Sequence, residues 1–176
     1  MTGQAQNVSI TGNQFTLDGK PIWFNGINTP WHNWADFGGN FVPSWWRQEF
    51  QRYADNKINL ARVWIHCAGA NSPTTNPDGS VTGASAAFWA HMDSIVAISK
   101  QKKVYLLPCL WSFDMVKNSN QTTFQRYRNL LNSQANIQSY IDNFLIPLIK
   151  RYNKEPYVLG WEICNEPEWM FKNAEN

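Results

Sequence analysis

The sequence predicts an α/β fold with a parallel sheet, because strand-like and helix-like segments alternate along its 176 residues. Four apolar runs rich in β-branched and aromatic residues each lead into a polar loop, and three segments with apolar residues at helical spacing separate them. Strands that recur at intervals of roughly 35–50 residues indicate parallel pairing through right-handed crossovers. The chain can bury one core of ordinary size, so we expect a single domain over residues 1–176.

A short N-terminal β-hairpin is expected over residues 8–20. Residues 8–18 alternate around Gly12-Asn13, a pair that favours a tight hairpin turn. Asp18 and Gly19 then turn the chain into the first main strand, and βα units occupy residues 21–176.

The main strands and helices follow in regular order. Pro43 and Ser44 are typical of a helix start, and aromatic residues recur at helical spacing after them. Strands are predicted at 22–28, 58–66, 103–111 and 157–164, and helices at about 43–57, 85–102 and 137–148.

The longest polar loops leave the carboxyl ends of the predicted strands. Residues 67–84 are the clearest case, whereas the loops that enter the strands are short. Ligands of parallel α/β folds bind at the carboxyl ends of the strands, so we expect the functional face there.

The composition favours a neutral polar ligand. Charged residues make up 16% of the chain, against about 25% in an ordinary domain, whereas aromatic residues reach 15% with ten Trp. Indole rings stack on the apolar faces of sugars, which suits a glycan, although packing in the core is the alternative for most of them.

Nucleic acid and membrane are excluded as partners. The net charge of +2 has interspersed signs and no basic stripe, and no apolar run approaches the roughly 18 residues of a membrane span. The polar start lacks the hydrophobic region of a signal peptide, but a secreted protein whose signal had been removed would begin in the same way. We expect an extracellular location.

The three cysteines predict neither a disulfide framework nor a metal site. Cys67, Cys109 and Cys164 are an odd number, lie far apart and form no C-x-x-C spacing. We expect thiols buried as small hydrophobes near strand ends, and no metal or other cofactor.

The chemistry is concentrated at the end of the fourth predicted strand. Asn165-Glu166-Pro167 closes the string Trp-Glu-Ile-Cys-Asn-Glu-Pro that begins at Trp161. A carboxyl group at this place faces the functional end of the sheet, where partial burial favours the protonated form that a general acid needs.

Nearly the whole chain resembles glycoside hydrolase family five. The members of this family are retaining β-glycosidases of clan A, and their fourth strand ends in Asn-Glu-Pro. Segments 17–21 and 24–26 are similar to the family's first strand, and segment 59–64, Asn-Leu-Ala-Arg-Val-Trp, to its second, which carries a barrel arginine. The Arg-x-Trp pattern is closer to the endo-β-mannanase branch than to the cellulase branch. The resemblance implies the N-terminal half, (β/α)4, of a TIM (β/α)8 barrel with a short N-terminal hairpin.

The resemblance also implies roles for single residues. Glu166 would be the general acid/base, and Asn165 would hydrogen-bond the 2-hydroxyl of the sugar being cleaved. Arg62 would stay charged and orient a carboxylate, although a structural ion pair with Glu162, two strands away, is an equally open interpretation. The implied substrate is a β-1,4-linked polysaccharide, either β-mannan or β-glucan.

Further side chains are candidates for substrate contacts. Trp64 and His66 alternate with Arg62 on one predicted strand, so we expect all three on the inward face near the barrel mouth. His66 has a hydrogen-bonded place in the wall as its alternative. The tryptophans that follow strand ends are candidate sugar platforms, with plain packing as the alternative: Trp31, Trp34, Trp111 and Trp169.

The residues present do not complete a retaining site. Retention needs a second carboxylate about 5–5.5 Å from the first, which in the resembled family comes from the seventh strand. A homodimer would supply eight strands and remove the open sheet edges, and it would predict inversion at the anomeric carbon, or very weak activity. The alternatives are a catalytically incomplete glycan-binding half-barrel and a part of a longer family-five enzyme.

Overall fold

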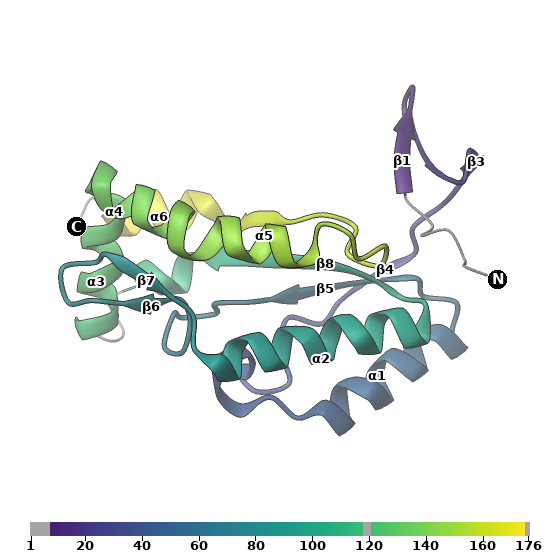
Figure 1. Ribbon diagram of the computed structural model, residues 1–176, viewed down its shortest axis with the longest axis horizontal. Coiled ribbons are helices and arrows are strands. Elements are labelled where there is room, and N and C mark those ends of the chain that lie inside the picture. The colour runs from purple at the N-terminus through teal and green to yellow at the C-terminus, as the bar shows by residue number, and fades with distance from the viewer. Residues whose placement is uncertain (1–7, 118–120, 175–176) are drawn as a thin grey trace.

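The computed structural model describes residues 8–117 and 121–174 and shows an α/β fold with a parallel sheet, as predicted. The main sheet has the order β4-β5-β8-β9, and every neighbouring pair is parallel. Its strands are β4 Gly26–Asn28, β5 Leu60–Trp64, β8 Tyr105–Ser112 and β9 Glu162–Asn165. In Figure 1 the carboxyl ends of β5 and β8 point toward the side on which the C-terminus lies.

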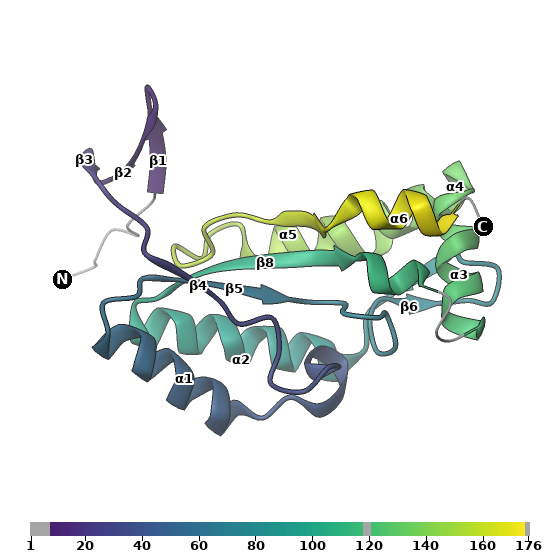
Figure 2. The ribbon, with the colours of Figure 1, turned by 180° about the vertical axis from the view of Figure 1, so that it is seen from behind.

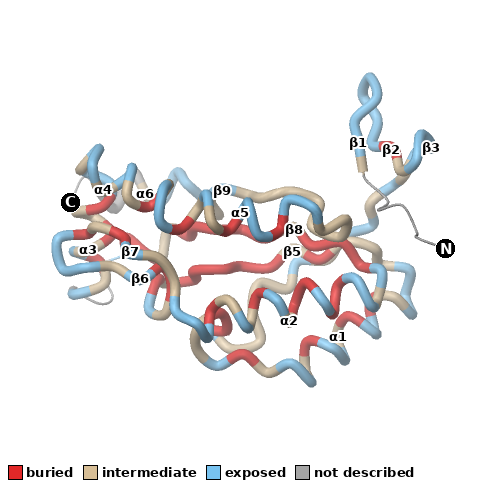
Figure 3. The backbone as a smooth tube through the Cα atoms, viewed as in Figure 1, coloured by how far each residue is buried: buried red, intermediate tan, exposed pale blue. Residues whose placement is uncertain are grey.

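Helices cover one face of this sheet. In Figure 2, α5 Ile146–Tyr152 lies behind β8, and α1 Pro43–Asp55 and α2 Ala86–Lys102 lie below β5. Ser85 caps α2 by accepting a hydrogen bond from the Phe88 N–H at 3.1 Å, and Pro43 opens α1. The core fills the space between sheet and helices, with buried residues along β5 and β8 and at intervals along α2 (Figure 3).

Some predicted elements are shorter than expected, and others were not predicted. The first strand is limited to Gly26–Asn28, and residues 157–161 contribute only the bridge between Val158 and Leu106. The long loop after β5 contains the small hairpin β6 Thr74–Thr75 and β7 Val81–Gly83. The helical region expected at 137–148 begins earlier than predicted. α3 Gln121–Leu131 precedes α4 Gln134–Tyr140, the π-helical segment Ile141–Leu145 and α5.

The N-terminal hairpin forms as predicted. β1 Val8–Thr11 pairs with β2 Gln14–Leu17 in a register that leaves Gly12 and Asn13 as the turn, and Gly12 has the positive φ that this turn needs. A third short strand, β3 Lys20–Pro21, pairs with β2, and this sheet stands away from the main one (Figure 1).

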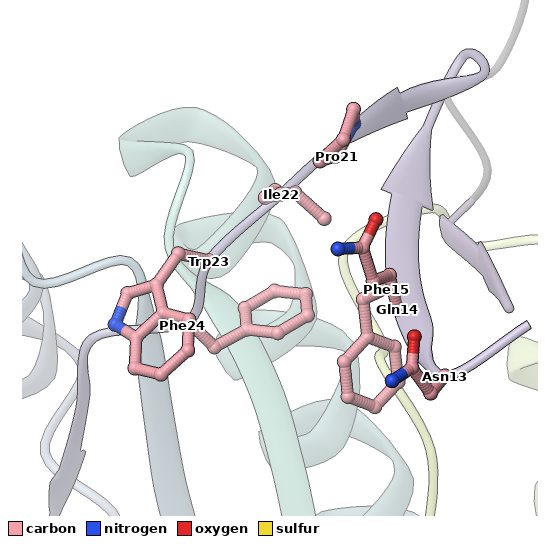
Figure 4. Close-up of a pocket in the computed structure, with 7 residues that line it drawn as sticks. All are labelled: Asn13, Gln14, Phe15, Pro21, Ile22, Trp23 and Phe24. Carbon is pink, nitrogen blue, oxygen red and sulfur yellow. The ribbon is translucent and has the colours of Figure 1, made fainter. Parts of the chain in front are cut away.

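A hollow of about 600 Å³ lies between the hairpin and the chain that enters β4. Phe15 from the hairpin contacts Phe24 edge to face at 5.3 Å, and Phe24 contacts Tyr105 in the same way at 5.3 Å. Figure 4 shows the hollow with the residues that line it: Asn13, Gln14, Phe15, Pro21, Ile22, Trp23 and Phe24. It is at the amino ends of the main strands, away from the predicted functional face.

Within the described residues, no helix is both long and apolar enough to span a membrane. Among residues 8–117 and 121–174, no group of three or more His, Cys, Asp or Glu side chains could hold a metal ion.

Candidate active site

The guanidinium group of Arg62 joins all four strands of the main sheet. From β5 it donates to Glu162 on β9 at 2.6 and 2.5 Å, and to the side-chain oxygen of Asn28 on β4 at 3.0 Å. It also donates to the Cys109 sulfur on β8 at 3.6 Å, and to Asn165 Oδ1 at the end of β9 at 3.0 Å. Arg62 is therefore the centre of a polar cluster on the sheet face opposite the helices.

The pair between Arg62 and Glu162, which the sequence left open, is present. The two hydrogen bonds are bidentate, the geometry in which guanidinium and carboxylate interact most strongly. Hydrogen bonding from Arg62 lowers the pKa of Glu162, although partial burial opposes this effect. The same hydrogen bonds raise the pKa of Arg62, so both groups stay charged around neutral pH.

Asn165 connects this pair to Glu166. Its Oδ1 accepts from Arg62, and its Nδ2 donates to Glu166 Oε2 at 3.4 Å. Glu162 and Asn165 are three residues apart, yet both reach Arg62, so β9 departs here from the simple alternation of a strand. The result is a continuous series from Glu162 through Arg62 and Asn165 to Glu166.

Glu166 has an unusual backbone conformation. Its φ of 49° lies in the left-handed region, which costs a residue with a side chain roughly 1–2 kcal/mol. Such conformations persist where the surrounding structure holds them, and they cluster at active sites. Glu166 is exposed between β9 and α6 Pro167–Ala174, so the partial burial that we expected is not found in this structure.

Three tryptophans gather beside Arg62. The rings of Trp31 and Trp34 meet edge to face, with 4.6 Å between their centroids. The centroid of the Trp64 ring lies 5.1 Å from that of Trp31 and 6.2 Å from that of Trp34. The guanidinium carbon of Arg62 lies 5.9 Å from the centre of the Trp64 ring. Trp64 is buried with Cys67 and Cys109, Trp31 is half-buried, and Trp34 is 38% exposed. Trp34 therefore presents the most accessible ring of this indole cluster.

His66 is not on the face of Arg62 and Trp64, so this expectation was wrong. The N–H groups of Ile65 and His66 both bond β8, at Cys109 and Leu110, which breaks the two-residue alternation after Trp64. His66 is 3% exposed, and its ring is hydrogen-bonded to Ser72 at 3.0 Å and Tyr140 at 3.3 Å. His66 thus occupies a hydrogen-bonded position in the wall, which was the alternative expectation for it. Its buried ring is not placed to touch a ligand.

Trp111 is likewise placed apart from the cluster around Arg62. Its buried ring packs against Tyr127 and Tyr140 at 5.6 and 5.2 Å, from α3 and α4. The expectation of an open sugar platform at Trp111 is corrected to core packing. Trp169, by contrast, is 46% exposed on α6, three residues after Glu166.

Sequence reasoning missed Asn28 and Asp36. Asn28 ends the first predicted strand, and its place at a carboxyl end was the signal that could have identified it as a partner of Arg62. Asp36 accepts hydrogen bonds from the backbone between Trp31 and Trp34, and no local pattern in the sequence indicates this contact.

The cysteines remain protonated thiols at neutral pH. Burial raises the pKa of Cys67 and of Cys109 to about 12, and that of Cys164 to about 11. Thiols, not thiolates, therefore flank the site, and none of the three is an activated nucleophile.

The chain is similar to β-mannanases. No family model matches it. A mannan endo-1,4-β-mannosidase of Mytilus edulis is 30% identical over 179 residues, which cover 99% of this chain and 48% of that protein. The crystal structure of the Mytilus edulis β-mannanase has a TM-score of 0.84, covering 94% of this chain and 47% of that one. The β-1,4-mannanase of Aplysia kurodai has 29% identity and a TM-score of 0.82, with 92% and 47% covered. The chain thus spans about half the length of the curated relatives it matches.

Proposed function

We propose that this chain carries the acid/base part of an endo-β-1,4-mannan hydrolase with a TIM-barrel architecture, in which it forms the first four βα units. The observation that supports this most directly is the series Glu162, Arg62, Asn165 and Glu166 beside an indole cluster. The similarity to mannan endo-1,4-β-mannosidases favours β-mannan over β-glucan as the substrate.

In this proposal Glu166 protonates the leaving oxygen of the glycosidic bond, as one of the two carboxyl groups that glycosidases use. Arg62 donates to Asn165 Oδ1 and so fixes the orientation of the amide, whose Nδ2 faces the side of Glu166. The amide N–H can then donate to the 2-hydroxyl of the sugar being cleaved. Arg62 is a positioning residue that acts through Asn165.

The second carboxylate of the reaction is expected from further βα units and not from Glu162. Glu162 faces the same cluster, but both its oxygens accept from Arg62, and its lowered pKa keeps it ionised as the partner of a cation. Glu162 therefore has a structural role as the partner of Arg62. A hydrolytic site needs another carboxyl group within reach of the same sugar.

Further strands would complete the barrel by pairing with the two edges of the main sheet. Within the described residues β4 and β9 each have one neighbouring strand, and Ile163 on β9 is 76% exposed. Unpaired edges favour association with further strands. Four more βα units, from a longer polypeptide or from a second copy related by a two-fold axis, would cover them.

The test compares reducing-sugar release from soluble mannan and β-glucan by wild type, Glu166→Gln and Glu168→Gln. Glu168 is a matched control because it is an exposed carboxyl in the first turn of α6. We expect mannan release to fall about 10²-fold or more in Glu166→Gln and to persist in Glu168→Gln. Measurable and equal rates in wild type and Glu166→Gln would contradict the proposed role.

Sedimentation equilibrium on the same samples tests whether a second copy of the chain completes the barrel. A stable dimer that releases sugar supports it. NMR of the earliest products should then show inversion, because the two Glu166 side chains would stand opposite each other, at roughly the 6.5–9.5 Å separation of inverting enzymes. Net retention by a pure dimer would contradict this arrangement.

A glycan-binding half-barrel is the second candidate, which the indole cluster favours. It predicts equal calorimetric affinity of wild type and Glu166→Gln for mannopentaose, with no turnover by either protein.

An extracellular location is part of both proposals, because a polymeric glycan is met outside the cell. Detection of the protein in the culture medium of its producer would check this.

A further inference from the structure

The loop between β4 and α1 carries two rings of the indole cluster, and a buried carboxylate organises it. Trp31 and Trp34 bracket His32 and Asn33 in the sequence. Asp36 Oδ2 accepts from the backbone N–H of His32 at 2.7 Å and of Asn33 at 3.1 Å. The backbone N–H groups of both residues between the two tryptophans are therefore held by one side chain.

Further contacts hold the same loop. The Asn33 side chain donates to the Asn40 carbonyl at 2.8 Å, and the Asn40 N–H donates to the Ala35 carbonyl at 2.9 Å. The ring of His32 stacks on Trp45 of α1 at 4.4 Å. The loop is thus closed on itself and attached to the helix layer.

The loop also packs tightly against the chain that follows β5. Gly38 has a φ of 86°, and a side-chain carbon there would lie 2.8 Å from the Asn71 carbonyl oxygen. The Gly38 N–H donates to the ring of His91 on α2 at 3.1 Å. The path of the loop is therefore determined on both sides of Asp36.

Asp36 is buried at a cost that its contacts only partly offset. It is 1% exposed, and its second oxygen, Oδ1, makes no hydrogen bond within the described residues. The indole N–H of Trp46 is likewise buried without a hydrogen bond among the described residues, and burial raises the pKa of Asp36. Burying a carboxylate is unfavourable unless its hydrogen bonds replace those with water. Here Asp36 accepts two such bonds, from the N–H groups of His32 and Asn33.

We propose that Asp36 is a positioning residue that holds the Trp31 and Trp34 rings in the geometry of a sugar-binding platform. This inference rests on the proposed glycan-binding function for its consequence, but the positioning itself is a property of the free protein. A preorganised aromatic surface loses less conformational freedom on binding, so an intact loop should raise affinity for a β-1,4-linked oligosaccharide.

The experiment uses Asp36→Asn and Asp36→Ala in the full chain, with Asp78→Asn as the matched control. Asp78 is also a loop carboxylate that accepts a backbone hydrogen bond, from Ser80 at 2.9 Å, but in the turn between β6 and β7. The indole N–H resonances of Trp31 and Trp34, assigned with single Trp→Phe variants, report ring positions without ligand. Calorimetry with mannopentaose reports binding.

We expect both indole resonances to move in the Asp36 variants and to stay in place in Asp78→Asn. Mannopentaose affinity should fall about tenfold in Asp36→Ala and less in Asp36→Asn, because an amide still accepts a hydrogen bond. Moved resonances in a chain whose wild type binds no mannopentaose would sustain the positioning role and refute the proposed function. Unmoved resonances with unchanged affinity would refute the positioning role alone.

Hydrogen exchange in the wild type covers the case in which the Asp36 variants do not fold. The amides of His32 and Asn33 should exchange at least about tenfold more slowly than exposed, unbonded loop amides, because Asp36 holds both. Exchange of these two amides at the rate of an exposed loop would overturn the inference.

Discussion

Arg62 and Glu162 are 100 residues apart in the sequence, yet two hydrogen bonds of 2.6 and 2.5 Å join their side chains. Arg62 lies on β5 and Glu162 on β9, so the pair spans β8, whose Cys109 contacts the same guanidinium. Both side chains are less than a third exposed. The pair therefore connects strands that the backbone ladder does not pair directly, and it sets the orientation of Asn165.

Arg62→Lys should destabilise the protein by about 2 kcal/mol, because an ammonium group cannot replace a bidentate, partly buried contact that also reaches Asn28 and Asn165. Urea unfolding followed by circular dichroism measures this. Arg151→Lys is the matched control, since Arg151 forms an exposed bidentate pair with Asp93, and there we expect a change within about 0.5 kcal/mol. Equal effects would mean that the cluster around Arg62 contributes no more than a surface pair.

Glu162→Gln should reduce the dependence of stability on pH in the acid range. The pKa of Glu162 is lowered from its usual 4.5, so its contribution is present above about pH 4.5 and is lost as the pH falls through the lowered value. The variant should be less stable than wild type at pH 7 and should approach it in acid. A constant difference between the two unfolding free energies from pH 7 to pH 3 would contradict this.

His66 should make the fold sensitive to mild acid. Burial lowers its pKa from 6.5 to about 3, so between these values the unfolded chain binds a proton that the folded protein does not. Stability should be unaffected by this group above about pH 6.5 and should fall by up to about 1.4 kcal/mol per pH unit below it. In His66→Gln the slope between pH 6 and pH 4 should be shallower; an unchanged slope would exclude His66 as its source.

Trp34→Ala should weaken oligosaccharide binding with little loss of stability, because the ring is 38% exposed at the edge of the indole cluster. We expect mannopentaose affinity to fall about tenfold, as is typical when one stacking ring is removed. Trp64→Ala should instead destabilise the protein by about 3 kcal/mol, because that ring is buried.

Trp23→Ala is the control for this comparison, since Trp23 is exposed beside the hollow at the other end of the strands. It should leave mannopentaose affinity unchanged. Calorimetry and urea unfolding on the three variants separate binding from stability, and an equal loss of affinity in Trp23→Ala would exclude a specific platform at Trp34.

The sequence by itself determined those features that depend on neighbouring residues. The turn at Gly12-Asn13, the helix starts at Pro43 and Ser85, and the position of Asn165-Glu166 at the end of a strand follow from local backbone preferences and apolar periodicity. The α/β fold class could be predicted for the same reason, because four strands alternating with helices leave few arrangements.

Only the tertiary structure decided which side chains meet. His66 was expected beside Arg62, but two successive N–H groups bonded to β8 turn it toward Tyr140, a residue 74 positions away. Trp111 packs inward for a similar reason, against helices whose positions periodicity does not specify. Asp36 and Asn28 make their hydrogen bonds, to the His32 N–H and to Arg62, only in the folded chain, where the loop and the strands meet. Spacing in a sequence predicts the face of a regular strand, whereas irregular strand ends and loops take their geometry from long-range contacts.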